Sequence, residues 1–481
     1  MPTKKLLGRY VGDKNFYRTV LAVSIPIIIQ SGITNFVNLL DNIMVGQVST
    51  AAMSGVSIVN QFIFVFNLLV FGAVSAAGIF TAQFHGLGDV EGVRHTFRFK
   101  ILINLLAGIL GVAVFAAFDD QLIKLFLQME SESSDLSPAE ALYYGKQYLW
   151  PMLIGLIPYA ISQAYASTMR ETGQTVVPMI ASTTAVVTNF VLNAILIFGL
   201  LGAPALGVMG AAIATVVSRF VELAILIIWG HTHKEKCPYI VGAYRSLYIP
   251  KSLFGSIVAK GLPLMANEVF WAIAITFRNQ SYSTCGLEVV AAQNIAVTVI
   301  NLFSVVYLSL GSSIAIIVGN QLGAGEIEKA RDTDRKMIAF SITGAAAIAL
   351  IMIGLSSVFP LLYKTSDSVR SLSAFMIVVS SCAMPFFAYA HAAYFTLRSG
   401  GRVGITLLFD SVYMWSIVIP TVALLANFTS ISIYALYIAG TVAEMLKCVF
   451  GFIFLRKINW ARRLVAKPQT EIECHEAVNV E

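Results

Sequence analysis

Charged residues are scarce in this chain of 481 residues: only 12% are Asp, Glu, Lys or Arg, whereas 57% are hydrophobic. A soluble globular domain has about 25% charged residues, so the shortage excludes an ordinary soluble domain. Cysteine is also rare, with five residues and neither a CxxC pair nor a zinc-ligand spacing, so no zinc site is expected. The composition indicates a polytopic membrane protein in which the cysteines are apolar fillers.

Motifs of enzymes and nucleotide-binding proteins are missing as well. The sequence has no GxxxxGK[ST], HExxH or GxSxG, which argues against a Walker-type ATPase, a zinc protease and a serine hydrolase. We therefore expect no enzyme and no cofactor. The first apolar stretch is too long for a signal peptide and lacks a small-residue cleavage site, so we expect no cleaved leader.

Long apolar stretches fill most of the chain. A transmembrane helix needs about 20 mainly apolar residues, and the absence of alternating ten-residue strands excludes a barrel. The sequence predicts twelve transmembrane helices, at 17–45, 51–82, 98–118, 141–166, 174–200, 206–231, 252–282, 288–319, 337–363, 371–397, 403–426 and 430–456.

The basic residues give these helices an orientation. With a cytoplasmic N-terminus, 24 of the 32 Lys and Arg residues fall in or beside cytoplasmic segments and only four on the outside, as the positive-inside rule requires. This placement accounts for the net charge of +6 without a nucleic-acid partner. Both termini are then cytoplasmic. The predicted segments are a cytoplasmic start (1–14), an N-lobe (15–231), a cytoplasmic linker (232–251), a C-lobe (252–457) and a cytoplasmic tail (458–481).

The two lobes are an internal repeat. "HGLGDVEGVRHTFR" at 85 resembles "LGAGEIEKARDTDR" at 322, and an offset of 237 pairs Pro26 with Pro263 and Gly86 with Gly323. At an offset of 228, "RETG" at 170 pairs with "RSGG" at 398. Because each repeat has six helices, both have the same orientation, as in transporters whose halves surround a central cleft. The predicted fold is all-α, with two six-helix bundles related by a parallel pseudo-two-fold axis.

The chain resembles the MATE family of multidrug and toxic compound extrusion transporters, of the bacterial type. The resemblance runs from about residue 15 to 460. It rests on "LLDNIMVGQVSTAAMSGVSI", "FTAQFHGLGD", "TMRETGQTVVPM", "NFVLNAILIFG" and "PALGVMGAAIATVVSR". It implies a V-shaped cleft and export of organic, often cationic, compounds driven by inward movement of Na+ or H+.

The first predicted helix carries one polar face. Gln30, Thr34, Asn38 and Asp41 lie within a sector of about 80° around the helix axis. An ionisable group near hydrocarbon is costly and usually faces a wet cavity, so we expect this face to point inward. The alternative is that Asp41 is an interfacial acid at the outer helix end. The resemblance implies a coupling carboxylate at Asp41.

The fifth predicted helix carries Asn189 and Asn193, four residues apart on one face, and Thr215 on the sixth is a further candidate of this cluster. Many MATE sequences have an aspartate at the position of Asn193. An amide does not titrate in the physiological range, so a proton relay through this position is in doubt. Hydrogen bonding between helices is the alternative role.

Two acids stand out in the C-terminal half. Glu268 matches the glutamate of MATE transporters of the NorM type, where the implied role is Na+ coordination. Those relatives carry an acid in the tenth helix, whereas 371–397 has none, and Asp410 is a candidate replacement. A Na+ site at Glu268, Asp410 or Asp41 needs several oxygens, whereas a proton needs one carboxyl group; both remain open. The alternative role of Glu268 is an ion pair with Arg278 or Lys260, and a structural role is also open for Asp410.

Other charged residues in the predicted helices are expected to be structural. The spacing of three residues predicts the ion pairs Glu444–Lys447 and Arg219–Glu222. Arg278 aligns with Asp41 in the repeat. It either neutralises an acid across the cleft or extends to the membrane surface, and we favour the second interpretation.

Aromatic side chains and methionine suit a wall that binds cationic aromatic compounds, although packing is the commoner role of any single one. The candidates are Phe62, Phe66, Trp271, Tyr307, Tyr389, Tyr413 and Met414.

The leading hypothesis is an antiporter in the plasma membrane, monomeric and surrounded by lipid. A flippase for lipid-linked oligosaccharides, from the same wider superfamily, is the alternative; it calls for a basic cavity, whereas the intramembrane acids favour cations. A channel would require a selectivity filter, which the sequence does not indicate.

Overall fold

The computed structural model describes residues 8–46, 48–130, 138–363 and 365–465. Within these ranges, the side chains of 37–43, 46, 50, 125–130, 138 and 287 lie outside the description. The predicted polar face of the first helix is therefore described only in part, because the side chains of Asn38 and Asp41 belong to this group.

Helices make up almost all of the described chain, and every predicted transmembrane segment overlaps one or more of them. The helices of the N-lobe are α2 (Lys14–Gly46), α3 (Thr50–Leu87), α4 (Val90–Ala117), α5 (Asp119–Glu130), α6 (Pro138–Glu171), α7 (Val176–Phe198), η1 (Leu200–Gly202) and α8 (Val208–Thr232). The linker holds η2 (Pro238–Ile240). The C-lobe contains α9 (Lys251–Ser283), α10 (Leu287–Gly323), α11 (Ile327–Leu355), η3 (Phe359–Leu362), α12 (Asp367–Ser399), α13 (Val403–Leu407), η4 (Leu408–Val412), η5 (Met414–Val418), α14 (Ile419–Phe428), α15 (Ile433–Met445) and α16 (Lys447–Lys457).

Length and composition confirm a membrane protein. Eleven helical segments of the described chain are long and apolar enough to span a bilayer. The predicted span 141–166 corresponds to α6, which is as long as the others but is not among the eleven.

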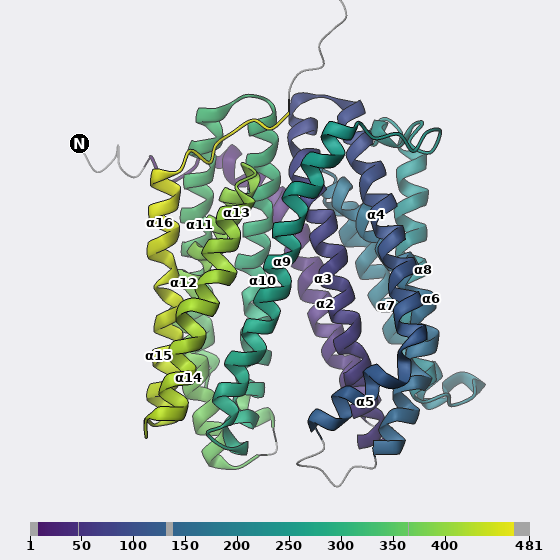
Figure 1. The fold of residues 1–481 in the computed structure, drawn as a ribbon, viewed down its shortest axis with the longest axis vertical. Coiled ribbons are helices and arrows are strands. Elements are labelled where there is room, and N and C mark those ends of the chain that lie inside the picture. Colours follow the sequence, from purple (N-terminus) through teal and green to yellow (C-terminus); the bar gives the residue numbers. More distant parts are fainter. Residues whose placement is uncertain (1–7, 47, 131–137, 364, 466–481) are drawn as a thin grey trace, which may run out of the picture.

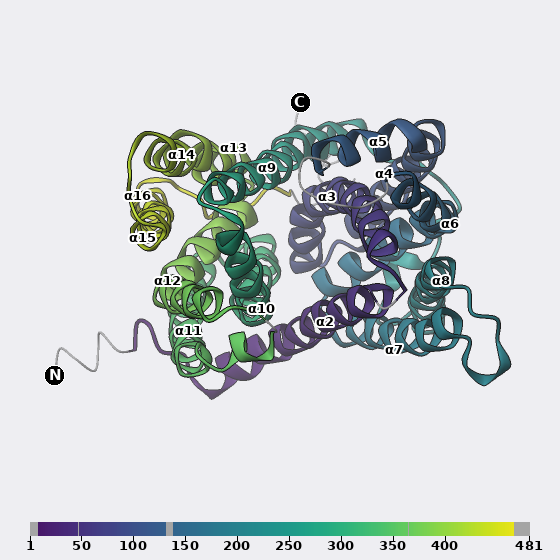
Figure 2. The same ribbon diagram turned by 90° about the horizontal axis from the view of Figure 1, so that it is seen from below.

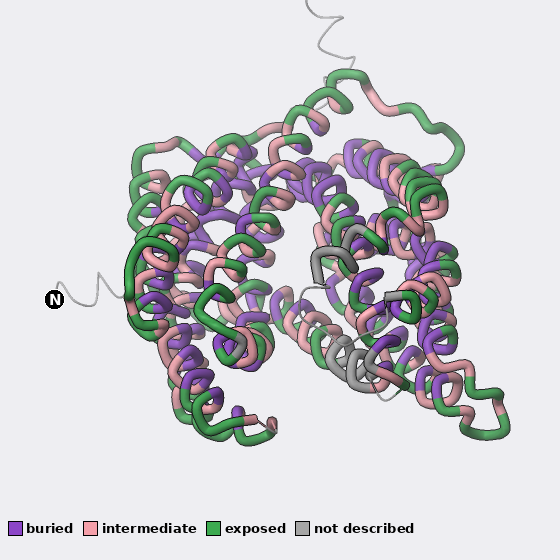
Figure 3. The backbone as a smooth tube through the Cα atoms, turned by 60° about the horizontal axis from the view of Figure 1, so that its bottom comes forward, coloured by how far each residue is buried: buried purple, intermediate pink, exposed green. Residues whose placement is uncertain are grey.

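Two bundles stand side by side, with α3–α8 on one side and α10–α16 on the other (Figure 1). Seen along the helices, α2 and α9 lie on opposite sides of the molecule (Figure 2). Each packs against both bundles: α2 against α7 and α10, and α9 against α13, α14 and α3. Buried residues face the inside of the bundles and exposed ones the outside (Figure 3). The fold therefore has the predicted pseudo-two-fold arrangement.

The axis of the repeat passes between α3 and α10. A Cβ atom on Gly86 would lie 1.8 Å from the carbonyl oxygen of Asn320, and one on Gly323 would lie 1.9 Å from that of Gln83. The offset of 237 pairs Gly86 with Gly323 and Gln83 with Asn320, so the repeat relates these two contacts to each other. The two helices thus touch backbone to backbone at the end that we predict to be cytoplasmic, which only glycine permits at this separation.

Several elements differ from the sequence prediction. The predicted span 337–363 is shifted, because α11 begins at Ile327 and ends at Leu355. The segment after α4 forms a further helix, α5. The predicted helix 403–426 is interrupted by two π-helical segments, η4 and η5. The first turns of α4 and α11 carry charged residues and precede the apolar stretches of these helices. A search for apolar runs therefore places the start of both helices too late.

Candidate functional site

A cavity of about 360 Å³, called here the central cavity, lies between the two lobes. Ile27, Ser31 and Phe71 line it from α2 and α3, and all its other lining residues belong to the C-lobe. Glu268 and Asp410 both face it, together with Trp271 and Tyr307. The structure thus brings together four of the residues singled out in the C-terminal half of the sequence.

Asn267 on α9 connects the acidic residues of this cavity. It is 1% exposed, and its amide nitrogen donates to Oδ2 of Asp410 at 3.0 Å and to the hydroxyl of Tyr394 at 3.4 Å. Its Oδ1 accepts from the Ser411 hydroxyl at 2.7 Å and from the Ser411 backbone N–H at 3.3 Å. Asn267 therefore holds α9 against η4.

Asp410 and Ser411 lie in the π-helical segment η4. A π-turn widens the helix and changes the partners of its backbone N–H groups, and such turns occur frequently at functional sites. The hydroxyl of Ser411 also donates to the backbone carbonyl of Asn267 at 2.8 Å. The side chain of Asn267 and the hydroxyl of Ser411 thus join the two backbones beside Asp410.

Two ion pairs in the C-lobe differ from the predicted ones. Lys447 pairs with Asp410, not with Glu444, and Glu444 accepts from Arg278 at 2.6 Å. The predicted pair Glu444–Lys447 is wrong because α15 ends at Met445 and α16 begins at Lys447, so the spacing of three does not place both side chains on one helical face. The preferred outward position of Arg278 is also wrong.

Glu268 differs from the other acids of the central cavity. Its Oε1 accepts from the Tyr394 hydroxyl at 3.3 Å, and within the described residues no Lys, Arg or His nitrogen lies within 4.0 Å of its carboxylate. Neither alternative ion pair of Glu268 forms, since Arg278 contacts Glu444 and Lys260 donates to the carbonyl of Gly401 at 3.0 Å. Glu268 is therefore an acid in a cavity without a basic partner among these residues.

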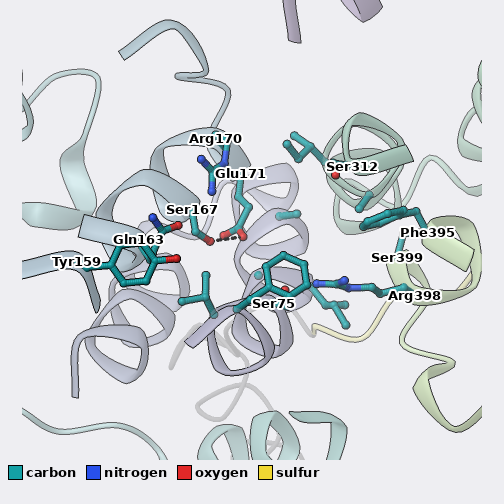
Figure 4. A pocket seen from close by; sticks show the side chains of 17 residues that line it. Ser75, Tyr159, Gln163, Ser167, Arg170, Glu171, Ser312, Phe395, Arg398 and Ser399 are labelled. Atoms are coloured by element: carbon teal, nitrogen blue, oxygen red, sulfur yellow. Dashed lines mark hydrogen bonds between the residues drawn. The ribbon is translucent and has the colours of Figure 1, made fainter. Parts of the chain in front are cut away.

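A smaller cavity of about 160 Å³ lies next to the first, and Phe71, Ser312, Phe395 and Arg398 line both. We call it the inner cavity. Figure 4 shows Arg170 and Glu171 on one side and Arg398 on the other. The neighbours of Glu171 are basic and polar: it pairs with the fully buried Lys100 and accepts from Ser167 at 2.7 Å.

The N-lobe brings its three predicted amide and hydroxyl groups together. Asn193 donates to Oδ1 of Asn189 at 3.2 Å, and Asn189 donates to the hydroxyl of Thr215 at 3.1 Å. Gln30 accepts from Arg170 at 3.5 Å, and the Thr34 hydroxyl donates to the backbone carbonyl of Gln30 at 2.9 Å. The predicted ion pair Arg219–Glu222 is confirmed at 3.5 Å.

The predicted aromatic wall is divided between the cavity and the packing cores. Trp271 and Tyr307 line the central cavity. Phe62 and Phe66 lie in the core of the N-lobe, Tyr389 packs on a C-lobe core, and Tyr413 and Met414 are buried between α9, η5 and α15. These five are outside the linings of both cavities.

Sequence reasoning missed several residues of the site, namely Asn267, Tyr394, Arg398, Ser411 and Lys447. The sequence does contain a signal for Asn267, because this polar residue directly precedes Glu268 in an otherwise apolar stretch. Arg398 was assigned only to the cytoplasmic charge pattern. Its position at the end of a long helix gave no sign that it turns into the cavity.

The comparisons agree with this architecture. The family model MatE matches residues 26–195 and 265–424, one block in each lobe. Curated relatives include the "Probable multidrug resistance protein NorM" of Thermotoga maritima, 23% identical over 451 residues and covering 93% of this chain and 94% of the relative. NorM of Halalkalibacterium halodurans is 25% identical over 438 residues, covering 90% and 92%.

Solved structures share the fold. A multidrug resistance MATE family transporter described in an outward-facing conformation has a TM-score of 0.83 at 19% identity, covering 94% of this chain and 97% of that chain. A MOP superfamily transporter from Pyrococcus furiosus has a TM-score of 0.82 at 18% identity, with the same coverage. The match of the family model to both lobes shows that this chain belongs to the MATE family of transporters.

Proposed function

We propose that the protein exports small organic compounds, mostly cationic drugs or toxic compounds, in exchange for Na+ or H+. Support comes from the family, from relatives named multidrug resistance proteins, and from a cavity between the lobes that combines aromatic rings with acids. The oligosaccharide flippase is not favoured by these relatives. We place the protein in the plasma membrane as a monomer in contact with lipid, with both termini cytoplasmic.

The unpaired carboxylate of Glu268 is the observation that carries this proposal. The two other acids of the central cavity have basic partners, Lys447 for Asp410 and Arg278 for Glu444. An acid without a basic partner in a mostly apolar cavity is a site where a cation or a proton binds favourably. If the coupling ion and the cationic substrate compete for one carboxylate, they bind to it one at a time. The two are then not carried together in the same direction, as antiport requires.

The surroundings of Glu268 favour H+ over Na+ as the coupling ion. Na+ is a hard cation that needs several oxygen ligands, and a second carboxylate would contribute most of the attraction. Asp410 and Glu444, the other carboxylates of this cavity among the described residues, are already neutralised by Lys447 and Arg278. A Na+ site that used both carboxylates would require Lys447 to leave, whereas protonation of Glu268 requires no rearrangement.

Transport by purified protein in liposomes tests the proposal. The vesicles are loaded with a fluorescent organic cation, and either a Na+ or a proton gradient is imposed. We expect gradient-driven movement by the unaltered protein, and movement by Glu268→Gln no faster than in protein-free vesicles. The amide keeps an acceptor for Tyr394, so this variant should fold.

Glu328→Gln is the matched control, since Glu328 is an exposed acid that pairs with Arg331 on the surface of α11. It should transport at the unaltered rate. Normal transport by Glu268→Gln would refute the role of this carboxylate, and equal leak with and without a gradient would refute antiport.

A further inference from the structure

Arg398 is the second unbalanced charge of the central cavity. Five formally charged side chains of the described residues line this cavity: Glu268, Asp410, Glu444, Arg398 and Lys447. Lys447 and Asp410 neutralise each other, and Glu444 is neutralised by Arg278. The cavity is left with one acid, Glu268, and one base, Arg398, with more than 4.0 Å between their charged atoms.

The guanidinium of Arg398 is buried, and no carboxylate of the described residues lies within 4.0 Å of it. The residue is 6% exposed, and its Nη1 has no hydrogen-bond partner within the described part of the chain. Its Cζ lies 5.3 Å from the ring centre of Phe395 and 5.7 Å from that of Phe71. Aromatic faces attract a cation but accept no strong hydrogen bond from Nη1, so this donor remains free to bind a ligand.

The equivalent arginine of the N-lobe makes the contrast clear. Arg170 occupies the same position in the repeat and lines the inner cavity, where its Nη1 donates to Gln30 at 3.5 Å. An acid, Glu171, follows it in the chain, whereas Ser399 follows Arg398. The C-lobe thus presents an arginine at the junction of both cavities and no carboxylate beside it in sequence.

A guanidinium prefers a planar oxyanion, because its fork of N–H groups matches the two oxygens of a carboxylate. Burial strengthens this preference, since an unpaired charge in an apolar setting is costly until a counter-ion arrives. A cationic group of the same ligand has Glu268 as its partner, and Trp271 and Tyr307 offer aromatic faces in the same cavity. A ligand with both a cationic and an anionic group would therefore match the charges of Glu268 and Arg398.

We propose that the central cavity binds zwitterionic amphiphiles, with the ligand's carboxylate on Arg398 and its cationic group directed to Glu268. This inference rests on the proposed export function and narrows its substrate class. Arg398 is a binding and specificity-determining residue in this scheme. A purely cationic compound uses only half of the site.

A matched pair of dyes tests the inference. One is a rhodamine with a free carboxylate, and the other is the methyl ester of the same dye, which keeps the delocalised cation but lacks the anion. Binding to the purified full-length protein is measured by fluorescence anisotropy. We expect the free acid to bind about ten-fold more tightly than the ester, which is the usual scale of a charge-assisted bidentate contact.

Three variants assign this preference to a residue. In Arg398→Gln the preference for the acid should disappear, and in Arg398→Lys it should be intermediate, since an ammonium keeps the charge but loses the fork. Arg370→Gln is the matched control, because Arg370 lies on the same helix in an ion pair with the exposed Asp367. It should keep the full preference.

The outcomes separate this inference from the proposed function. Equal or tighter binding of the ester by the unaltered protein overturns the inference, even if Arg398→Gln fails to fold. An undiminished preference for the acid in a folded Arg398→Gln overturns it as well. Gradient-driven transport of the ester in liposomes, without any acid preference, leaves the export function standing, whereas transport of neither dye refutes both.

Discussion

The two lobes use one helical framework for different chemistry. In the described N-lobe, Asn189, Asn193 and Thr215 form a chain of hydrogen bonds between α7 and α8, and the ion pair of Lys100 with Glu171 lies beside the inner cavity. In the C-lobe, Asn267 donates to Asp410 and to Tyr394, and the Tyr394 hydroxyl donates to Glu268. Among the described residues, all acids that line the central cavity come from the C-lobe. A duplicated bundle can therefore keep its packing while one copy supplies the acids of the cavity, which makes the C-lobe the expected location of coupling.

The largest expected effect comes from breaking the ion pair of Asp410 with Lys447 in the central cavity. Asp410→Asn leaves Lys447, whose side chain is only 12% exposed, without its counter-charge, which costs about 3 kcal/mol. Denaturant unfolding in mixed micelles measures this loss. The double variant Asp410→Asn/Lys447→Met should recover most of it, because no charge then remains.

The N-lobe offers a matched test of the same physics. Lys100 is fully buried and pairs with Glu171, so Lys100→Met should also cost several kcal/mol. If Asp410→Asn unfolds no more easily than the unaltered protein, the ion pair with Lys447 is not what stabilises the C-lobe site.

The next effect tests the symmetry of the two lobes. Gly86→Ala and Gly323→Ala place a methyl group against the carbonyl oxygen of the opposite helix, so α3 and α10 must separate. We expect each to cost about 3 kcal/mol, the upper end for overpacking, and the two losses to be similar because the contacts are reciprocal.

Gly255→Ala is the control for these variants. It lies in α9 with nothing within 4 Å of the added Cβ, so it should be neutral or stabilise by up to about 1 kcal/mol. Thermal unfolding in detergent compares the three proteins. A large difference between Gly86→Ala and Gly323→Ala would break the symmetry that the sequence repeat implies.

A third prediction separates two residues that the repeat makes equivalent. Gln83 donates to the carbonyls of Ser399 and Arg462 and accepts from the N–H of Leu464 at 2.7 Å. Its counterpart Asn320 has a buried Oδ1 without a hydrogen-bond partner in the described structure. Gln83→Ala should therefore cost about 1–2 kcal/mol.

Asn320→Ala should cost less than Gln83→Ala in the same unfolding assay. The stretch around Arg462 and Leu464 follows the C-lobe, in the predicted cytoplasmic tail, and lies against α3 of the N-lobe. Equal losses in both variants would mean that these contacts contribute nothing to joining the lobes.

Most of the fold could be predicted from the sequence, because apolar length and a repeat are properties of the chain itself. The resemblance to MATE transporters, and not helix length or the repeat, made Asp410 a candidate replacement for the missing acid, and Asp410 does line one cavity with Glu268. The partners of Lys447 and Arg278 could not be predicted, since they depend on the break between α15 and α16. The π-turns beside Asp410 had no sequence signal either. Predictions from helical periodicity assume an unbroken helix. This site includes residues at the break between α15 and α16 and in the π-helical segment η4, where that assumption does not hold.

The smallest effect concerns the hydrogen-bonded chain of Asn189, Asn193 and Thr215 in the N-lobe. Asn193→Ala removes the hydrogen bond that Asn193 donates to Asn189 on the same helix, and side-chain hydrogen bonds within a membrane protein contribute about 0.6 kcal/mol on average. We expect a loss of this order and transport within about two-fold of the unaltered rate, because an amide that does not titrate carries no proton. Dye efflux from liposomes under a proton gradient provides the measurement. Loss of transport in a stably folded Asn193→Ala would move coupling into the N-lobe and would reverse the division of labour between the two lobes.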